Sequence, residues 1–207
     1  MRRGLVVIDV QDVYRSGPLP IVFPPLADCL AHIGHAMDSA GQAGVPIVVV
    51  QSVPADTPRR DPNPMWALLP EVADRRRDHL LIKHLPSCFA GTDLDALLRA
   101  WGIDTLTMVG FMTHNCVDAT VKDAVHRGYQ VEVLSDATGS LPYANSAGAV
   151  DAVTLHTATL VVMQARFAAV ATTRAWLQAL ATNTPLPRGT IIDSARAGAA
   201  LFTCDDT

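Results

Sequence analysis

The stretch GLVVIDVQ, residues 4–11, decides the fold of this chain. Leu5 to Ile8 form an unbroken apolar run that is dense in β-branched side chains, and the acidic residue Asp9 follows it at once. Continuous apolarity, in place of alternation, is typical of a parallel strand that is covered by helices on both faces. The stretch therefore predicts a buried first strand whose carboxyl end carries Asp9.

Similar runs recur along the chain and alternate with segments of helix length. The predicted strands are Pro46 to Val50, Thr105 to Val109 and Val131 to Leu134, with weaker candidates at Leu80 to Lys83 and Thr159 to Val162. The predicted helices are Leu26 to Ala43, Asp93 to Trp101, Thr113 or His114 to His126, Asn145 to His156, and Ala168 to Ala181. This alternation predicts an α/β fold, with a doubly wound, mostly parallel six-stranded sheet and helices on both faces.

The composition is that of one compact globular domain. The chain has 207 residues, of which 49% are hydrophobic and 17% charged, so it can build a core and is not intrinsically disordered. A net charge of −4 argues against binding to a nucleic-acid backbone. The four cysteines lack CxxC spacing, which favours reduced thiols and a cytoplasmic location, and no apolar run is long enough to span a membrane.

Two segments depart from the regular alternation. Residues 52–70 contain five prolines, which predicts a long irregular loop, either a lid or contact arm or an inert surface loop. We assign residues 1–183 to the domain and residues 184–207 to a C-terminal extension that is flexible or contacts a partner.

Three residues of complementary chemistry are predicted to meet at the carboxyl edge of the sheet, namely Asp9, Lys83 and Cys116. The N-terminus of a helix lowers the pKa of a thiol such as that of Cys116, and Asp9 is placed to accept the thiol proton. Lys83 is placed to hold Asp9 ionised. Taken singly, each has a structural alternative: an inert buried cysteine, an aspartate that caps a loop, or a lysine that extends into solvent.

Three separated segments carry a resemblance to a known family. They are LVVIDVQDVY at residues 5–14, KHLPSCFAGTDLDALL at residues 83–98 and GFMTHNCVDATVKDA at residues 110–124. In their order and spacing these segments resemble the isochorismatase-like cysteine hydrolase family, and the resemblance extends from residue 4 to about residue 180.

The resemblance implies a set of functional residues and partners. It implies a catalytic triad of Asp9, Lys83 and Cys116, and a non-proline cis peptide bond that joins Phe111 to Met112. The N–H groups of Met112 and Cys116 would then form an oxyanion hole. The substrate-pocket residues are expected to be Gln11, Tyr14, Phe89, Thr113 and His114. The resemblance implies a small-molecule substrate and a homo-oligomer (dimer or tetramer), and the reaction it suggests needs no organic cofactor.

The implied reaction is hydrolysis of a non-peptide C–N bond, in an amide or ureido group, through a thioester on Cys116. Two alternatives stay open: a vinyl ether hydrolase of the isochorismatase type, which releases pyruvate, and a non-catalytic or redox-responsive member. The presence of Cys116 favours the first reading, because isochorismatases proper do not need a cysteine nucleophile.

Nicotinamidases of this family hold a metal with one aspartate and two histidines soon after the second strand. In this chain Asp56 and Asp61 lie in that region, but no histidine occurs between His35 and His79. The sequence therefore does not predict a metal site of the nicotinamidase type.

Overall fold

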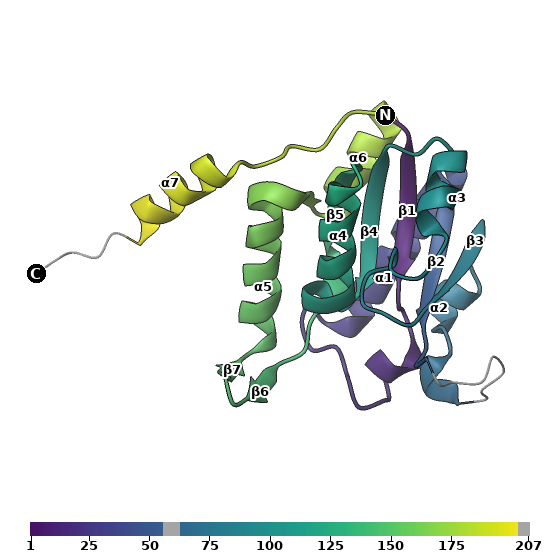
Figure 1. The fold of residues 1–207 in the computed structure, drawn as a ribbon, viewed down its shortest axis with the longest axis horizontal. Helices are drawn as coiled ribbons and strands as arrows, with labels where there is room; N and C mark the ends of the chain where they lie inside the picture. Colours follow the sequence, from purple (N-terminus) through teal and green to yellow (C-terminus); the bar gives the residue numbers. More distant parts are fainter. Residues whose placement is uncertain (56–62, 203–207) are drawn as a thin grey trace, which may run out of the picture.

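A single parallel sheet organises the computed structural model, which describes residues 1–55 and 63–202 (Figure 1). The strand order is β3-β2-β1-β4-β5-β8, and every neighbouring pair in it is parallel. The strands are β1 (Arg3–Ile8), β2 (Ile47–Ser52), β3 (His79–Lys83), β4 (Thr105–Phe111), β5 (Gln130–Gly139) and β8 (Ala169–Ala171). The doubly wound six-stranded fold predicted from the sequence is confirmed.

Helices cover both faces of the sheet, and a short hairpin extends from its carboxyl edge. The helices are α1 (Leu26–Gln42), α2 (Pro70–Ala73), α3 (Leu94–Ala100), α4 (Asp118–His126), α5 (Ala152–Val162), α6 (Thr173–Thr182) and α7 (Ile191–Leu201). The hairpin pairs β6 (Tyr143–Asn145) with β7 (Gly148–Val150) in antiparallel fashion. The direction of winding reverses between β1 and β4, and in such sheets ligands bind outside the carboxyl ends at this reversal.

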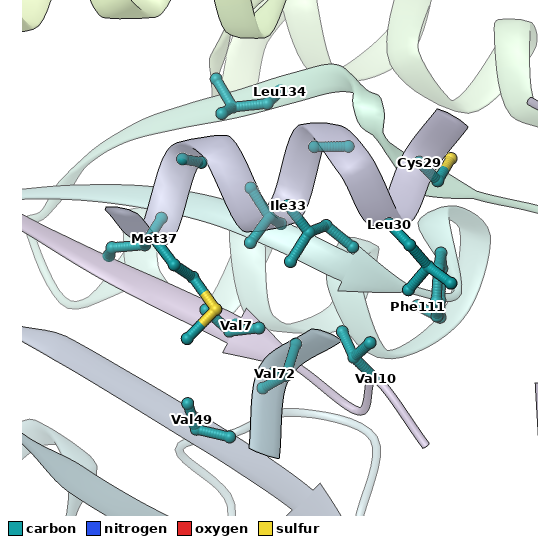
Figure 2. Close-up of a cluster of buried hydrophobic side chains, with 14 of the residues drawn as sticks. Val7, Val10, Cys29, Leu30, Ile33, Met37, Val49, Val72, Phe111 and Leu134 are labelled. Carbon is teal, nitrogen blue, oxygen red and sulfur yellow. The ribbon is translucent and has the colours of Figure 1, made fainter. Parts of the chain in front are cut away.

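The strands are apolar at successive positions because their side chains contribute to two separate hydrophobic cores, one on each face of the sheet. Leu5 and Val7 of β1 point into a core shared with α1, α2 and α6, and Figure 2 shows Ile33 and Met37 of α1 packed there with Val7. Val6 of β1 points the other way, into a core shared with α3, α4 and α5. Since successive strand residues face opposite sides, a strand between two helical layers must be apolar at every position.

Two sequence predictions are wrong near the last strand. Thr159 to Val162, predicted as a strand, forms the end of α5. The sixth strand is instead β8, which lies inside the predicted helix Ala168 to Ala181. The helix of that region starts only after Thr172, whose side chain accepts a hydrogen bond from the N–H of Ala175. The β-branched residues at the end of α5 misled the prediction because an apolar run alone does not separate a strand from a helix.

The predicted helix Asn145 to His156 also begins too early. Residues Tyr143 to Val150 form the β6–β7 hairpin, and α5 starts after Asp151, whose carboxylate caps it by accepting from the N–H of Thr154 at 2.8 Å. The start of α5 is therefore set by Asp151, a residue type that is favoured as the N-cap of a helix.

The structure describes only part of each of the two segments that depart from the regular alternation, residues 52–70 and 184–207. Of the predicted loop 52–70, residues 56–62, which include Asp56 and Asp61, lie outside the described residues, while Pro64–Trp66 forms a short helical turn. The extension after residue 183 contains α7, which Figure 1 shows in yellow, projecting away from the sheet and its helices. The assignment of a domain boundary at residue 183 stays a prediction. None of the described helices has the length and apolarity needed to cross a membrane.

Candidate active site

The site begins at the carboxyl ends of the neighbouring strands β1 and β4. Asp9 follows β1 directly and takes a left-handed backbone conformation, with φ of 52°. Ile8, the residue before Asp9, pairs with Gly110 of the adjacent strand β4, and Gly110 has φ of 107°. A Cβ at Gly110 would lie 2.0 Å from the carbonyl oxygen of Ile8, so only glycine fits there. This contact brings the segment after β4 against the Asp9 side chain.

Lys83 reaches this point from the edge of the sheet. It is the last residue of β3, two strands away from β1, a separation of about 10 Å that a lysine side chain and the strand twist can bridge. Its Nζ lies 2.9 Å from Oδ2 of Asp9, and both side chains are 0% exposed. The same ammonium donates to Sγ of Cys116 at 3.2 Å and to the carbonyl oxygen of Leu85 at 3.1 Å. All three of its donors are therefore used, and two of them join a carboxylate to a thiol.

Cys116 lies in a tight turn between β4 and α4. The turn, Thr113–Val117, has π-helical geometry, and the carbonyl oxygen of Met112 accepts from the N–H of Val117 at 3.2 Å. The carbonyl oxygen of Cys116 accepts from the hydroxyl of Thr120 at 2.6 Å. That hydroxyl in turn accepts from the N–H of Cys88 at 3.1 Å, which ties the segment after β3 to α4. The nucleophile candidate is thus held by its own backbone and by the neighbouring loop.

Burial sets the protonation of the cluster. It raises the pKa of the Cys116 thiol to about 12, with the nearby charge of Asp9 acting in the same direction and Lys83 opposing both. Burial also raises the pKa of Asp9, against the attraction of Lys83. For Lys83, burial alone lowers the pKa, but the charges of Asp9 and Cys116 outweigh it and raise the pKa. The resting site thus holds a thiol beside an unusually basic carboxylate, whereas the sequence predicted a thiol acidified by a helix N-terminus.

The peptide bond that joins Phe111 to Met112 is cis. Phe111 is the last residue of β4, and its ring lies 5.6 Å from that of Tyr14 between centroids. Met112 starts the turn that carries Cys116, so the two backbone N–H groups expected to form an oxyanion hole belong to one turn. That role for them stays a prediction.

Thr113 and His114 lie in the same turn but make different contacts. The hydroxyl of Thr113 is 3.0 Å from Nδ1 of His156, and Nε2 of His156 is 3.1 Å from the carbonyl oxygen of Ser135. Because that carbonyl can only accept, Nε2 carries the proton and Nδ1 accepts from Thr113. Thr113 is fully buried and fixes the turn to α5.

His114 faces the hairpin, where its ring lies edge-on to the ring of Tyr143 at 4.9 Å between centroids. Its Nδ1 is 3.0 Å from the hydroxyl oxygen of Ser140, while Nε2 is buried with no hydrogen-bond partner among the described residues. Burial lowers the pKa of His114, with Asp118 opposing, so the neutral ring is favoured. The role of His114 in the substrate pocket stays a prediction.

Two further residues expected in the pocket, Gln11 and Tyr14, follow β1 in the chain. The side-chain amide of Gln11 is used by backbone groups, donating to the carbonyl oxygens of Ser52 and Trp66 and accepting from the N–H of Ser52. Gln11 therefore fixes the loop after β2. Tyr14 is buried, and the charges of Asp9 and Cys116 add to the effect of burial in raising its pKa.

Phe89 is nearly buried in the core on the α4 side. Its ring stacks at 6.0 Å on that of Tyr129, and the guanidinium of Arg127 covers it at 4.8 Å. These contacts explain how Phe89 holds the segment after β3 in place. Its predicted role in binding substrate is not tested by them and stays a prediction.

The described residues offer no ready-made cluster of metal ligands. Among residues 1–55 and 63–202, no group of three or more His, Cys, Asp or Glu side chains is arranged to hold an ion. The ionisable groups that meet at the site are those of Asp9, Lys83 and Cys116.

Several residues of the site escaped sequence reasoning. Thr120, the carbonyl group of Leu85, Tyr143 and His156 all contact the triad or its turn. Thr120 lies one helical turn after Cys116, a spacing that could have been noticed. Tyr143 and His156 gave no local signal, because the hairpin and α5 reach the site only through tertiary packing.

Comparisons with known proteins identify related sequences and structures. A sequence model described as an isochorismatase domain matches residues 3–175. The ureidoacrylate amidohydrolase RutB of Methylobacterium radiotolerans is 28% identical over 228 residues, covering 89% of this chain and 82% of RutB. The crystal structure of Bxe_A0706 from Burkholderia xenovorans LB400 has 50% sequence identity and a TM-score of 0.92, with 97% of each chain covered. A cysteine hydrolase from Pseudomonas syringae pv. phaseolicola 1448A is 28% identical with a TM-score of 0.80, covering 87% of this chain and 93% of that one.

Proposed function

This chain belongs to the isochorismatase family of hydrolases, and we propose that it cleaves a non-peptide C–N bond, in an amide or ureido group of a small molecule, through a thioester on Cys116. One observation carries the proposal. The buried ammonium of Lys83 lies 2.9 Å from the carboxylate of Asp9 and 3.2 Å from the thiol of Cys116. A related amidohydrolase, RutB, matches this chain over most of its length.

The first step transfers the thiol proton to Asp9 and forms a C–S bond as the carbonyl group becomes an oxyanion. Asp9, whose pKa is raised by burial, accepts the proton from Cys116 as the sulfur attacks the carbonyl carbon. Lys83 stabilises the charge that develops on sulfur because it already donates to Sγ. The backbone N–H groups of Met112 and Cys116 stabilise the oxyanion of the tetrahedral intermediate.

The remaining steps release both products and restore the enzyme. The tetrahedral intermediate collapses, the C–N bond breaks, and the leaving nitrogen takes the proton from Asp9. Water then attacks the thioester, Asp9 accepts a proton from that water, and the thiol of Cys116 is released after reprotonation. The products are a carboxylic or carbamic acid and ammonia or an amine.

The proposal is tested with a panel of small amides, ureido compounds and vinyl ethers, with detection of ammonia, amine and pyruvate. Wild type is compared with Cys116→Ala and with Cys29→Ala, a matched control at a buried cysteine whose thiol donates to the carbonyl oxygen of Thr138 at 3.3 Å. We expect ammonia or amine release by wild type and Cys29→Ala, an acyl adduct on Cys116 in intact-mass spectra, and no turnover by Cys116→Ala. Pyruvate release that survives Cys116→Ala would refute the thioester route and support vinyl ether hydrolysis. An absence of any product would support the non-catalytic reading.

A further inference from the structure

The outward face of α5 is unusual for a surface helix. Its exposed residues recur with helical spacing and form one continuous stripe, here called the α5 face: Val153, Thr154, Thr157, Ala158, Val161 and Val162. None of these residues is charged, and Val153, Val161 and Val162 are 50%, 59% and 52% exposed. A helix that is apolar on all sides is normally buried on all sides. The α5 face therefore lacks the charged side chains of an ordinary solvent-facing helix surface.

The C-terminal helix α7 also exposes apolar side chains, because it does not pack into a core of its own chain. None of the residues of α7 is buried, and Ile192, Leu201 and Phe202 are 62%, 77% and 82% exposed. Asp193 and Arg196 are its only charged residues. We call α7 with Phe202 the arm.

The arm is directed away from its own chain by a fixed root. The guanidinium of Arg188 donates to the carbonyl oxygens of Arg166 and Phe167, at 3.3 Å each, which pins the linker at the end of α5. Gly189 packs so closely that a Cβ there would lie 2.6 Å from the carbonyl oxygen of Gln164. Thr190 immediately caps α7 by accepting from the N–H of Asp193 at 3.0 Å. The arm follows this pinned root directly, and Figure 1 shows α7 directed away from the sheet and its helices.

We propose that the arm of one copy seats on the α5 face of a second copy, so that two chains exchange arms across an isologous interface. Each chain supplies one arm and one α5 face, so reciprocal exchange between two copies covers both apolar surfaces. An 11-residue helix is about 16 Å long and about 10 Å wide, so half of its lateral surface is about 250 Å². Counted on both partners, two seated arms bury on the order of 1,000 Å², the threshold for a specific interface.

The arm is also shared by a relative. The match to the isochorismatase domain ends at residue 175, before the arm, whereas the similarity to Bxe_A0706 covers 97% of the chain. Such a coverage has to include most of the segment after residue 183, so Bxe_A0706 carries an equivalent segment. The arm is thus an addition to the domain, and this inference does not depend on the reaction that the site performs.

The experiment measures the native mass of the full chain by light scattering during gel filtration, at micromolar concentration. We expect wild type at twice the 22.1 kDa of one chain, or a higher multiple. The variants Val161→Glu on the α5 face and Ile192→Lys on the arm should each at least halve that mass. Circular dichroism should show wild-type secondary structure for both, because both side chains are exposed.

Mixing the two variants separates arm exchange from other modes of association. In the mixed pair one contact joins a native arm to a native face, and the other joins the substituted arm to the substituted face, where the new lysine and the new glutamate have opposite charges. The native mass should therefore return. The matched control is Leu80→Lys, which places a charge on the exposed side of the edge strand β3, where Leu80 is 40% exposed, and should leave the mass unchanged. A monomeric wild type, no recovery on mixing, or dissociation by Leu80→Lys alone would each overturn the proposal.

Discussion

Replacing Lys83 by methionine is the change that tests the site most directly. Methionine keeps the length of the side chain and removes its charge, so packing changes little. The substitution leaves the carboxylate of Asp9 at 0% exposure without its partner at 2.9 Å. Removal of one member of a buried ion pair costs about 3 to 5 kcal/mol because the other charge stays desolvated. We expect the free energy of unfolding of Lys83→Met to fall by that amount.

The loss in the free energy of unfolding caused by Lys83→Met should depend on the residue at position 9 and on pH. In the double variant with Asp9→Asn both charges are gone, and asparagine tolerates the left-handed conformation at φ of 52°. The double variant should therefore be at least about 2 kcal/mol more stable than Lys83→Met alone. In Lys83→Met, burial raises the pKa of Asp9 above its unfolded value, so the folded state binds the extra proton. Stability should then fall as pH rises above about 4, which makes the penalty larger at pH 8 than at pH 5.

The assay is urea unfolding followed by circular dichroism at both pH values. The matched control is Lys122→Met, because Lys122 pairs with Asp118 within α4 and is 40% exposed. An exposed pair of this kind contributes about 0.5 kcal/mol, so the control should unfold close to wild type. Additive effects of Lys83→Met and Asp9→Asn, or equal losses for Lys83→Met and Lys122→Met, would refute the idea of a coupled buried pair.

Three further predictions concern titration and the polar core. Since burial raises the thiol pKa of Cys116 to about 12, its alkylation by iodoacetamide should keep accelerating up to pH 9, and a plateau near pH 7 would contradict this protonation state. Burial also lowers the pKa of His156 below its unfolded value, so stability should drop as pH falls through about 6.5. That slope should be shallower in His156→Asn, as measured by thermal unfolding between pH 5 and 8, and an unchanged slope would count against a buried neutral ring. Glu132→Ala strips the buried guanidinium of Arg3 of its partner at 2.8 Å and should cost about 3 to 5 kcal/mol in urea, whereas a wild-type midpoint would show that the pair adds nothing.

The accuracy of the sequence predictions differed between the centre of the fold and its C-terminal part. β1, β2 and β4 are buried on both faces, so an apolar run was enough to identify them. The error at Thr159 to Val162 has the same root, because this apolar run forms the end of α5, where Leu160 is buried but Val161 and Val162 are exposed. A short apolar segment indicates that its residues avoid water, but it does not indicate whether they form a strand or a helix.

The arrangement of the site shows the same division. The sequence placed Asp9 and Lys83 at strand ends and Cys116 in the turn after β4, since parallel strands bring their carboxyl ends to one edge. It did not reveal that one ammonium joins the carboxylate to the thiol, nor that burial raises the thiol pKa. Those properties arise from desolvation and from distances between segments far apart in the chain, which no local pattern encodes.

The sequence by itself determined five of the six strands, their parallel direction and the family resemblance, because these depend on local apolar runs and on the spacing of a few residues. Only the tertiary structure decided the partners of Gln11 and His114, the course of the hairpin and the direction of the arm. Each of these depends on contacts between groups distant in the chain, whose energies exist only after the chain has folded.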